Sequence, residues 1–221
     1  MTRSTPRLAV FDLDGTLVDS APDIHAALDR LALARGLAPY SRAEVTAMIG
    51  DGVRVLVERA LVARGQAFAN AALEAFSADY TAHAVEQTAL FAGIAEALAG
   101  LEAAGWRLAI CTNKPAAATA ALLDHLGLGP RFAAVGAGDS FAVKKPNPDH
   151  LRATIAAAGG RRERAVMVGD HRNDVMAARG LGVPAVFVRW GYGSAGMAAG
   201  AAAQADAPAD LPALLDRLLP A

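Results

Sequence analysis

The sequence has 221 residues and a formal net charge of -1; 54% of its residues are hydrophobic and 19% are charged. A chain of this length and composition can bury a core, which excludes an intrinsically disordered protein. Basic and acidic residues nearly balance and only 5% of the residues are aromatic, so we expect no nucleic-acid partner.

The N-terminal sequence and the cysteine content both bear on the compartment. Asp12 interrupts the first apolar stretch after about five residues, which is too short for a signal peptide or a membrane helix. Cys111 is the single cysteine and cannot form an internal disulfide, which fits a reducing compartment. We therefore expect a soluble, cytoplasmic protein that does not enter a membrane.

Short apolar runs recur along the chain and predict buried parallel strands. Amphipathic segments between them predict helices, and this alternation is typical of a doubly wound α/β sheet. The predicted strands are Leu8–Phe11, Arg107–Cys111, Ala133–Val135, Ala165–Val168 and Ala185–Val188. The predicted helices are Ile94–Ala104, Ala116–Leu126, Pro148–Ala158, Asn173–Leu181 and Leu211–Leu218.

One long interval contains no predicted strand. Between Leu17 and about Gln87, apolar residues recur at helical spacing in the segments Pro22–Arg35, Val53–Arg64 and Ala71–Val85. About 70 helical residues are too many for one crossover between strands, so they predict an inserted domain. We expect an α/β core of residues 1–17 and 88–221 and a helical cap of residues 18–87, with linkers near Val18–Ser20 and Thr88–Gly93.

Two aspartates follow the first predicted strand at its carboxyl end, where open α/β sheets bind ligands. Asp12 and Asp14 are separated by one residue, and Gly15 permits a tight turn behind them. Carboxylates this close repel each other unless a cation or a shared proton lies between them. The alternative is an ordinary capped turn, because Asp and Gly are common after strands.

The fourth predicted strand ends in a similar way, with Gly169 followed by Asp170 and then by Asp174. If this strand neighbours the first, its acids face Asp12 and Asp14. Such a cluster of carboxylates demands a hard divalent cation, for which Mg²⁺ is well suited. The alternative for Asp174 is that it only caps the next helix.

The other strand ends carry groups suited to phosphate. Thr112 and Asn113 precede a predicted helix, where a hydroxyl, an amide and backbone N–H groups can hold phosphate oxygens. Lys144 and Lys145 follow the third strand, and a lysine there would neutralise a phosphoryl group and the carboxylates. Taken alone, Thr112 and Asn113 are an ordinary helix start, and Lys144 and Lys145 lie in a solvated loop.

Together, the four strand ends resemble the four ordered motifs of the haloacid dehalogenase superfamily, over nearly the whole chain. The matching residues are Asp12-Leu13-Asp14-Gly15-Thr16, Thr112, Lys145, and Gly169-Asp170 with Asp174. The resemblance implies that Asp12 is a nucleophile that becomes an aspartyl phosphate, and that Asp14 is the general acid and base. It implies that Thr112 and Lys145 hold the phosphoryl oxygens. It also implies Mg²⁺ bound by Asp12, the backbone carbonyl of Asp14 and Asp170, with Asp174 in the same motif.

Within that superfamily the sequence is similar to the phosphoglycolate phosphatases in the segments 11–20, 49–53, 138–140 and 190–193. It departs from them at Ala92, where proline is usual, and at His171, where Ser or Thr often follows the metal aspartate. The similarity implies hydrolysis of 2-phosphoglycolate to glycolate and phosphate. Arg54 follows two glycines at a predicted helix start and is the candidate contact for the carboxylate of this substrate, the alternative being a solvated arginine.

Other functions stay open from the sequence. A phosphatase of another small metabolite, such as a sugar or nucleotide phosphate, or a sugar phosphomutase would keep all four motifs. A dehalogenase would not need Asp14 and Asp170, and a protein that only binds would lose a motif residue. Gly191–Gly196 matches a dinucleotide-binding fingerprint, but we expect no further strand to carry the ribose-binding acid, so we interpret it as a loop. The sequence does not indicate an oligomeric state.

Overall fold

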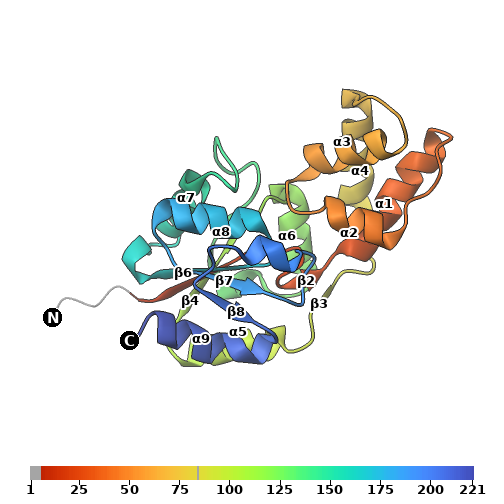
Figure 1. Cartoon of the computed structure of the whole chain (residues 1–221). Coiled ribbons are helices and arrows are strands. Elements are labelled where there is room, and N and C mark those ends of the chain that lie inside the picture. Colours follow the sequence, from red (N-terminus) through yellow and green to blue (C-terminus); the bar gives the residue numbers. More distant parts are fainter. Residues whose placement is uncertain (1–5, 84) are drawn as a thin grey trace.

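The computed structural model describes residues 6–83 and 85–221. A central parallel sheet lies between two layers of helices, and a group of four helices stands apart at one side (Figure 1). This arrangement confirms the doubly wound α/β class. Among the described residues, no helix combines the length and the apolar character that a membrane span requires.

The sheet has the strand order β5-β4-β1-β6-β7-β8, and every neighbouring pair is parallel. The central strand β1 alternates its side chains between the two faces, and both faces are buried. Ala9 and Phe11 join one core cluster, and Leu8 and Val10 join the other, which explains the uninterrupted apolar run. The strands are β1 (Leu8–Phe11), β4 (Arg107–Cys111), β5 (Phe132–Gly136), β6 (Ala165–Gly169), β7 (Ala185–Val188) and β8 (Ala203–Ala205).

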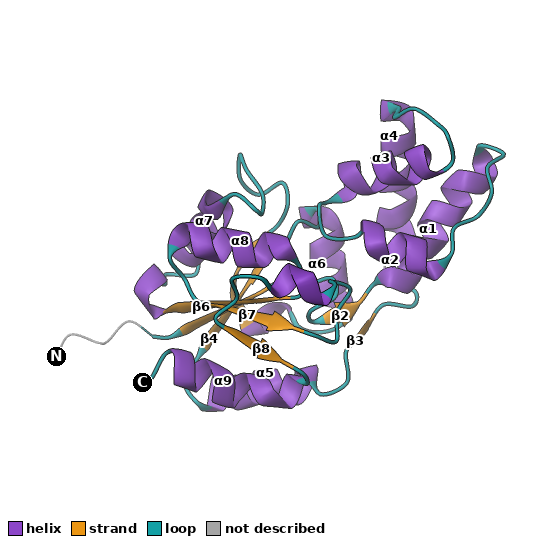
Figure 2. Cartoon of the chain, viewed as in Figure 1, coloured by secondary structure: helices purple, strands orange, loops and turns teal. Residues whose placement is uncertain are grey.

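Two layers of helices cover the sheet (Figure 2). The first core cluster includes residues of α5, α6 and α9, and the second includes residues of α7 and α8. The bounds are α5 (Ile94–Ala103), α6 (Ala116–His125), α7 (Pro148–Ala157), α8 (Arg172–Leu181) and α9 (Leu211–Leu218). All five predicted helices are therefore confirmed, with ends that shift by at most one residue.

The expectation of no strand after Gly196 is wrong, because β8 pairs with β7. Its sequence is Ala-Gln-Ala, and only Ala205 is fully buried. Three residues without a β-branched side chain carry no strand signal, so only the pairing with β7 creates this strand.

Four helices lie between the first two long strands and form a helical insertion: α1 (Ala21–Ala34), α2 (Arg42–Met48), α3 (Val53–Ala63) and α4 (Asn70–His83). They share a separate apolar core that includes Leu28, Val57 and Phe76. The sequence patterns missed α2, although Ser41 and Glu44 form a capping box at its start. Ala84, which the predicted last helix includes, lies outside the described residues. The division at residues 18–87 stays a prediction.

The insertion is joined to the core by two linkers that pair with each other. The strands β2 (Val18–Asp19) and β3 (Ala89–Leu90) form a short antiparallel ribbon. The buried carboxylate of Asp23 accepts hydrogen bonds from the backbone N–H groups of Gln87 and Thr88. These contacts hold the entering and leaving chains together at the carboxyl edge of the sheet.

Candidate active site

The carboxyl ends of β1 and β6 lie side by side because Phe11 and Val168 are in register. The backbone N–H of Asp12 donates to the carbonyl of Val168 at 2.9 Å, which extends the ladder by one step. Asp12 and Asp170 each follow directly after their strand, so the parallel register brings the two carboxylates together. The sequence left open whether these two strands are neighbours, and the structure shows that they are.

Three carboxylates form one buried cluster. Asp12, Asp170 and Asp174 each offer an oxygen, and these oxygens lie within 4.8 Å of one another. Burial, together with the charge of Asp12, raises the pKa of Asp170 to about 7. Burial also raises the pKa of Asp174, against the opposing charge of Lys145. These are hard oxygen donors at the spacing of a metal site, and they fit a divalent cation such as Mg²⁺. Among the described residues, this cluster includes no histidine.

Lys145 is the cation that the protein itself places in this cluster. Its ammonium group lies 2.9 Å from Asp12 Oδ1 and 2.6 Å from Asp174 Oδ1. Burial alone would lower the pKa of Lys145, but the two carboxylates outweigh burial and raise it. Two of the three carboxylates thus share this ammonium group, and no ion pair joins it to Asp170, so the cluster can accept further positive charge.

The loop Gly191–Gly193, which matches part of the dinucleotide fingerprint, surrounds Asp170. The backbone N–H groups of Tyr192 and Gly193 donate to Asp170 Oδ2 at 2.7 and 3.3 Å. Thr16 donates its hydroxyl to Oδ1 at 3.0 Å. A Cβ on Gly191 would lie 2.3 Å from the Cβ of Asp170, so a glycine is needed for this approach. The loop therefore orients an acid of the cluster.

Asp14 does not belong to the acidic cluster of Asp12, Asp170 and Asp174. Its Oδ1 accepts hydrogen bonds from the hydroxyl of Ser20 at 2.6 Å and from the ammonium group of Lys114 at 3.0 Å. We did not assign Lys114 from the sequence, although it is one of three lysines and follows Asn113 at a strand end. Binding of a metal by the backbone carbonyl of Asp14 stays a prediction.

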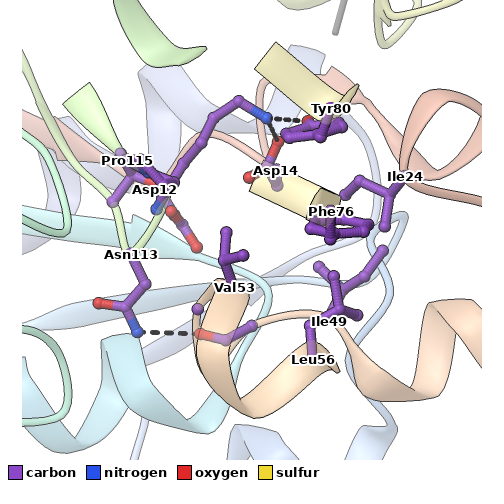
Figure 3. Close-up of a pocket in the computed structure, with 14 residues that line it drawn as sticks. Asp12, Asp14, Ile24, Ile49, Val53, Leu56, Phe76, Tyr80, Asn113 and Pro115 are labelled. Carbon is purple, nitrogen blue, oxygen red and sulfur yellow. Dashed lines mark hydrogen bonds and ion pairs between the residues drawn. The ribbon is translucent and has the colours of Figure 1, made fainter. Parts of the chain in front are cut away.

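A cavity opens between the strand ends and the insertion (Figure 3). Its lining on the core side comprises Asp12, Asp14, Thr112, Asn113, Lys114 and Pro115. Its lining on the insertion side comprises Ile24, Ile49, Gly50, Gly52, Val53, Leu56, Phe76 and Tyr80. Charged and polar groups thus occupy one wall, and mostly apolar side chains occupy the other.

The turn Gly50–Gly52 docks the insertion onto the core. Asn113 donates its amide to the carbonyls of Gly50 and Lys145, both at 2.9 Å. Asn173 donates to Asp51 Oδ1 at 2.7 Å. Gly50 has a φ of +119°, and a Cβ there would lie 2.7 Å from the ring of His171. The amide of Asn113, which we predicted to hold phosphate, is thus used to join two loops.

Three further residues were predicted to bind phosphate or substrate: Thr112, Gly15 and Arg54. Thr112 lines it and accepts the backbone N–H of Lys114 at 3.2 Å, and Gly15 has a φ of +81° beside Asp170. Arg54 is exposed, and its guanidinium lies 4.4 Å from the ring centre of Phe68. The structure does not bring Arg54 into the lining of the cavity, so a contact between Arg54 and a substrate stays a prediction.

Comparison with known proteins gives a family and several close relatives. The model of the haloacid dehalogenase-like hydrolases matches residues 6–182. The chain is 42% identical to a phosphoglycolate phosphatase of Agrobacterium fabrum over 86% of this chain and 84% of the relative. It is 43% identical to a phosphoglycolate phosphatase of Cereibacter sphaeroides over 83% of this chain and 85% of the relative.

Solved structures show the same fold. A protein from Haemophilus somnus 129pt, described as a predicted phosphoglycolate phosphatase, is 27% identical with a TM-score of 0.87 and covers 96% of this chain and 99% of its own. CbbY from Rhodobacter sphaeroides, solved in complex with phosphate, is 28% identical with a TM-score of 0.80 and covers 93% of this chain and 96% of its own.

Proposed function

We propose, because the chain belongs to the haloacid dehalogenase-like hydrolases, that it is a Mg²⁺-dependent phosphatase that converts 2-phosphoglycolate to glycolate and phosphate. The observation that carries this proposal is the position of Asp12. It lines the cavity, and it also belongs to the buried acidic cluster with Asp170 and Asp174. The relatives at 42–43% identity that are named phosphoglycolate phosphatases support the substrate.

Asp12 is the nucleophile in this proposal. Its Oδ1 accepts the backbone N–H of Leu13 at 2.7 Å and pairs with Lys145 at 2.9 Å. With both contacts on one oxygen, Oδ2 is the atom that attacks phosphorus and forms the aspartyl phosphate. Lys145 and Thr112 stabilise the charge that grows on the phosphoryl oxygens.

Asp14 is the general acid and base. Its Oδ1 is held by Ser20 and Lys114, so Oδ2 is the oxygen that protonates the leaving alkoxide. The same carboxylate then takes a proton from the water that attacks the aspartyl phosphate. Splitting the hydrolysis in this way replaces one difficult step by two easier ones.

Asp12, Asp170 and Asp174 are the side chains that would hold Mg²⁺, with the backbone carbonyl of Asp14 as a further ligand. When bound, the ion supplies positive charge that neutralises phosphoryl oxygens and lowers the repulsion among the carboxylates. Thr16 and the N–H groups of Tyr192 and Gly193 keep Asp170 oriented toward the cluster.

The insertion, which we propose as a cap of residues 18–87, selects the rest of the substrate. Helix α3 begins at Val53 on the cavity wall after the glycine turn, and its first turn contains no acidic residue. A helix N-terminus with free N–H groups favours an anion such as the carboxylate of phosphoglycolate. Ile24, Ile49, Leu56 and Phe76 line the same side and have no partner for sugar hydroxyls, which favours a small ester over a sugar phosphate.

A panel of phosphate esters tests the proposal. With Mg²⁺ present, kcat/KM for 2-phosphoglycolate should exceed that for ethyl phosphate, which lacks the carboxylate, by about 100-fold or more. Release of phosphate from glucose 1-phosphate or from a nucleoside monophosphate would indicate a sugar or nucleotide phosphatase. Isomerisation of glucose 1-phosphate would indicate a phosphomutase, and hydrolysis of chloroacetate would indicate a dehalogenase. Equal kcat/KM values for the two alkyl esters would refute 2-phosphoglycolate as the specific substrate, but the assignment of the protein as a phosphatase would stand.

Arg54→Ala tests the remaining prediction about the carboxylate. If Arg54 contacts the substrate during turnover, the variant should reduce the ratio of kcat/KM for phosphoglycolate to kcat/KM for ethyl phosphate. The value of kcat/KM for an aryl phosphate should stay the same. If this ratio is unchanged, the start of helix α3 is the better candidate for binding the carboxylate of the substrate.

A further inference from the structure

Two buried side chains, Lys114 and Tyr80, and the half-buried carboxylate of Asp14 come from distant parts of the chain and meet at one wall of the cavity. Lys114 donates to Asp14 Oδ1 at 3.0 Å and to the hydroxyl of Tyr80. The exposed fractions of Lys114 and Tyr80 are only 4% and 3%. Asp14 and Tyr80, which share Lys114 as a hydrogen-bond partner, lie on the same side of the cavity in Figure 3. Asp14 follows β1, Lys114 follows β4, and Tyr80 lies on helix α4 of the insertion.

Lys114 stays charged in this position because of its partners. Burial alone would lower the pKa of the ammonium group, but Asp14 and Tyr80 outweigh burial and raise it. A buried ammonium without such partners would be costly, so the position of Lys114 is tied to the position of Asp14.

The contact also orients Asp14. Ser20 and Lys114 both donate to Oδ1, which directs the carboxylate so that Oδ2 is available to a substrate. Proton transfer to a leaving group depends on geometry, and a small displacement of the acid has a large effect on the rate. Lys114 is therefore placed to act on the reaction through Asp14.

Tyr80 connects this arrangement to the insertion. Its ring stacks on Phe76 of the same helix with the ring centres 5.6 Å apart, and both rings lie in the core of the insertion. Its hydroxyl reaches Lys114 from the insertion, so this contact joins the insertion to the lysine that holds Asp14.

We propose that Lys114 is a positioning residue for Asp14, and that Tyr80 completes this position when the insertion closes over a substrate. This inference rests on the proposed function, in which Asp14 is the general acid. It assigns to Lys114 and Tyr80 an effect on proton donation to the leaving group that is separate from binding of the phosphoryl group.

Leaving groups of different basicity test the proposal. The value of kcat/KM reports formation of the aspartyl phosphate, in which glycolate needs a proton and p-nitrophenolate does not. Lys114→Met should lower kcat/KM for 2-phosphoglycolate on the order of tenfold or more, with a much smaller loss for p-nitrophenyl phosphate. Tyr80→Phe should also lower kcat/KM more for 2-phosphoglycolate than for p-nitrophenyl phosphate, but by a smaller factor than Lys114→Met. A merely structural effect would lower both values equally, and that result would overturn the proposal.

Two controls separate the possible failures. Tyr40→Phe removes another buried hydroxyl of the insertion, which donates to the carbonyl of Ala60, and should not change the ratio of the two kcat/KM values. Asp14→Asn should change this ratio, and adding Lys114→Met to it should have little further effect. If Asp14→Asn leaves the ratio unchanged, the proposed mechanism itself fails. If Asp14→Asn changes the ratio but Lys114→Met and Tyr80→Phe do not, only the positioning proposal fails.

Discussion

The ammonium group of Lys145 lies 2.9 Å from Oδ1 of Asp12. The same oxygen accepts the backbone N–H of Leu13, so both contacts of the carboxylate fall on one side. Lys145 also pairs with Asp174 at 2.6 Å, which links the proposed nucleophile to the acidic cluster. These contacts fix Oδ1 of the proposed nucleophile and leave Oδ2 available to a substrate in the cavity.

The first prediction separates the two aspartates that follow β1. Asp12→Asn should abolish turnover and formation of a phosphorylated protein, because an amide is not a nucleophile. Asp14→Asn should retain the nucleophile and lower kcat for 2-phosphoglycolate on the order of 10² to 10⁴-fold. Steady-state kinetics and the intact mass of the quenched enzyme measure the two effects. Normal turnover by Asp12→Asn would disprove the covalent mechanism.

The second prediction concerns the acidic cluster. Removal of divalent cations with a chelator should abolish activity, and Mg²⁺ should restore it, because the three carboxylates carry more charge than Lys145 neutralises. Ca²⁺ should inhibit, because its larger and looser coordination does not suit in-line attack. Mg²⁺ should also raise the melting temperature of the wild-type protein but much less that of Asp170→Asn. Full activity in metal-free buffer would contradict this prediction.

The third prediction tests the close contact between the insertion and the core. In Gly50→Ala the new Cβ would meet the ring of His171 at 2.7 Å, so the turn should dock poorly and kcat/KM should fall on the order of tenfold. Gly36→Ala is the matched control, because Gly36 also has a positive φ, of +65°, with nothing within 4 Å of the added Cβ. It should cost roughly 1 kcal/mol of stability and leave the kinetics unchanged. Equal kinetic losses in the two variants would show that backbone strain, and not docking, is responsible.

The fourth prediction is a pH dependence of stability. Burial and the nearby charge of Lys145 lower the pKa of His150 from 6.5 to about 4. The unfolded chain then binds the proton more readily than the folded chain, so the stability due to neutral His150 is lost as the pH falls between these values. Protonation would also compete with the hydrogen bond from the backbone N–H of Lys145 to Nδ1. In urea unfolding from pH 7 to pH 4, the free energy of unfolding of the wild type should fall relative to that of His150→Gln, since the raised pKa values of Asp170 and Asp174 act in the opposite direction in both proteins. An identical slope in the variant would rule out His150 as the cause.

The amino-acid sequence by itself determined the fold class and most of the proposed catalytic groups. Apolar runs mark strands that are buried on both faces, and their carboxyl ends must meet at one edge of a parallel sheet. Asp12, Asp170 and Lys145 could therefore be found from their positions after such runs. The short strand β8 and the helix α2 were missed because segments of three and seven residues carry little periodic signal.

Only the tertiary structure decided which side chains act on one another across the cavity. Tyr80 and Lys114 are 34 positions apart and Lys114 and Asp14 are 100 apart, so no local pattern relates them. Sequence periodicity reports whether a residue faces a core, but it does not report where one helical unit docks on another. That docking places Tyr80 beside Lys114, and it brings the carbonyl of Gly50 to the amide of Asn113. Both contacts depend on the relative position of two separately packed cores, which is set by contacts between residues that are distant along the chain.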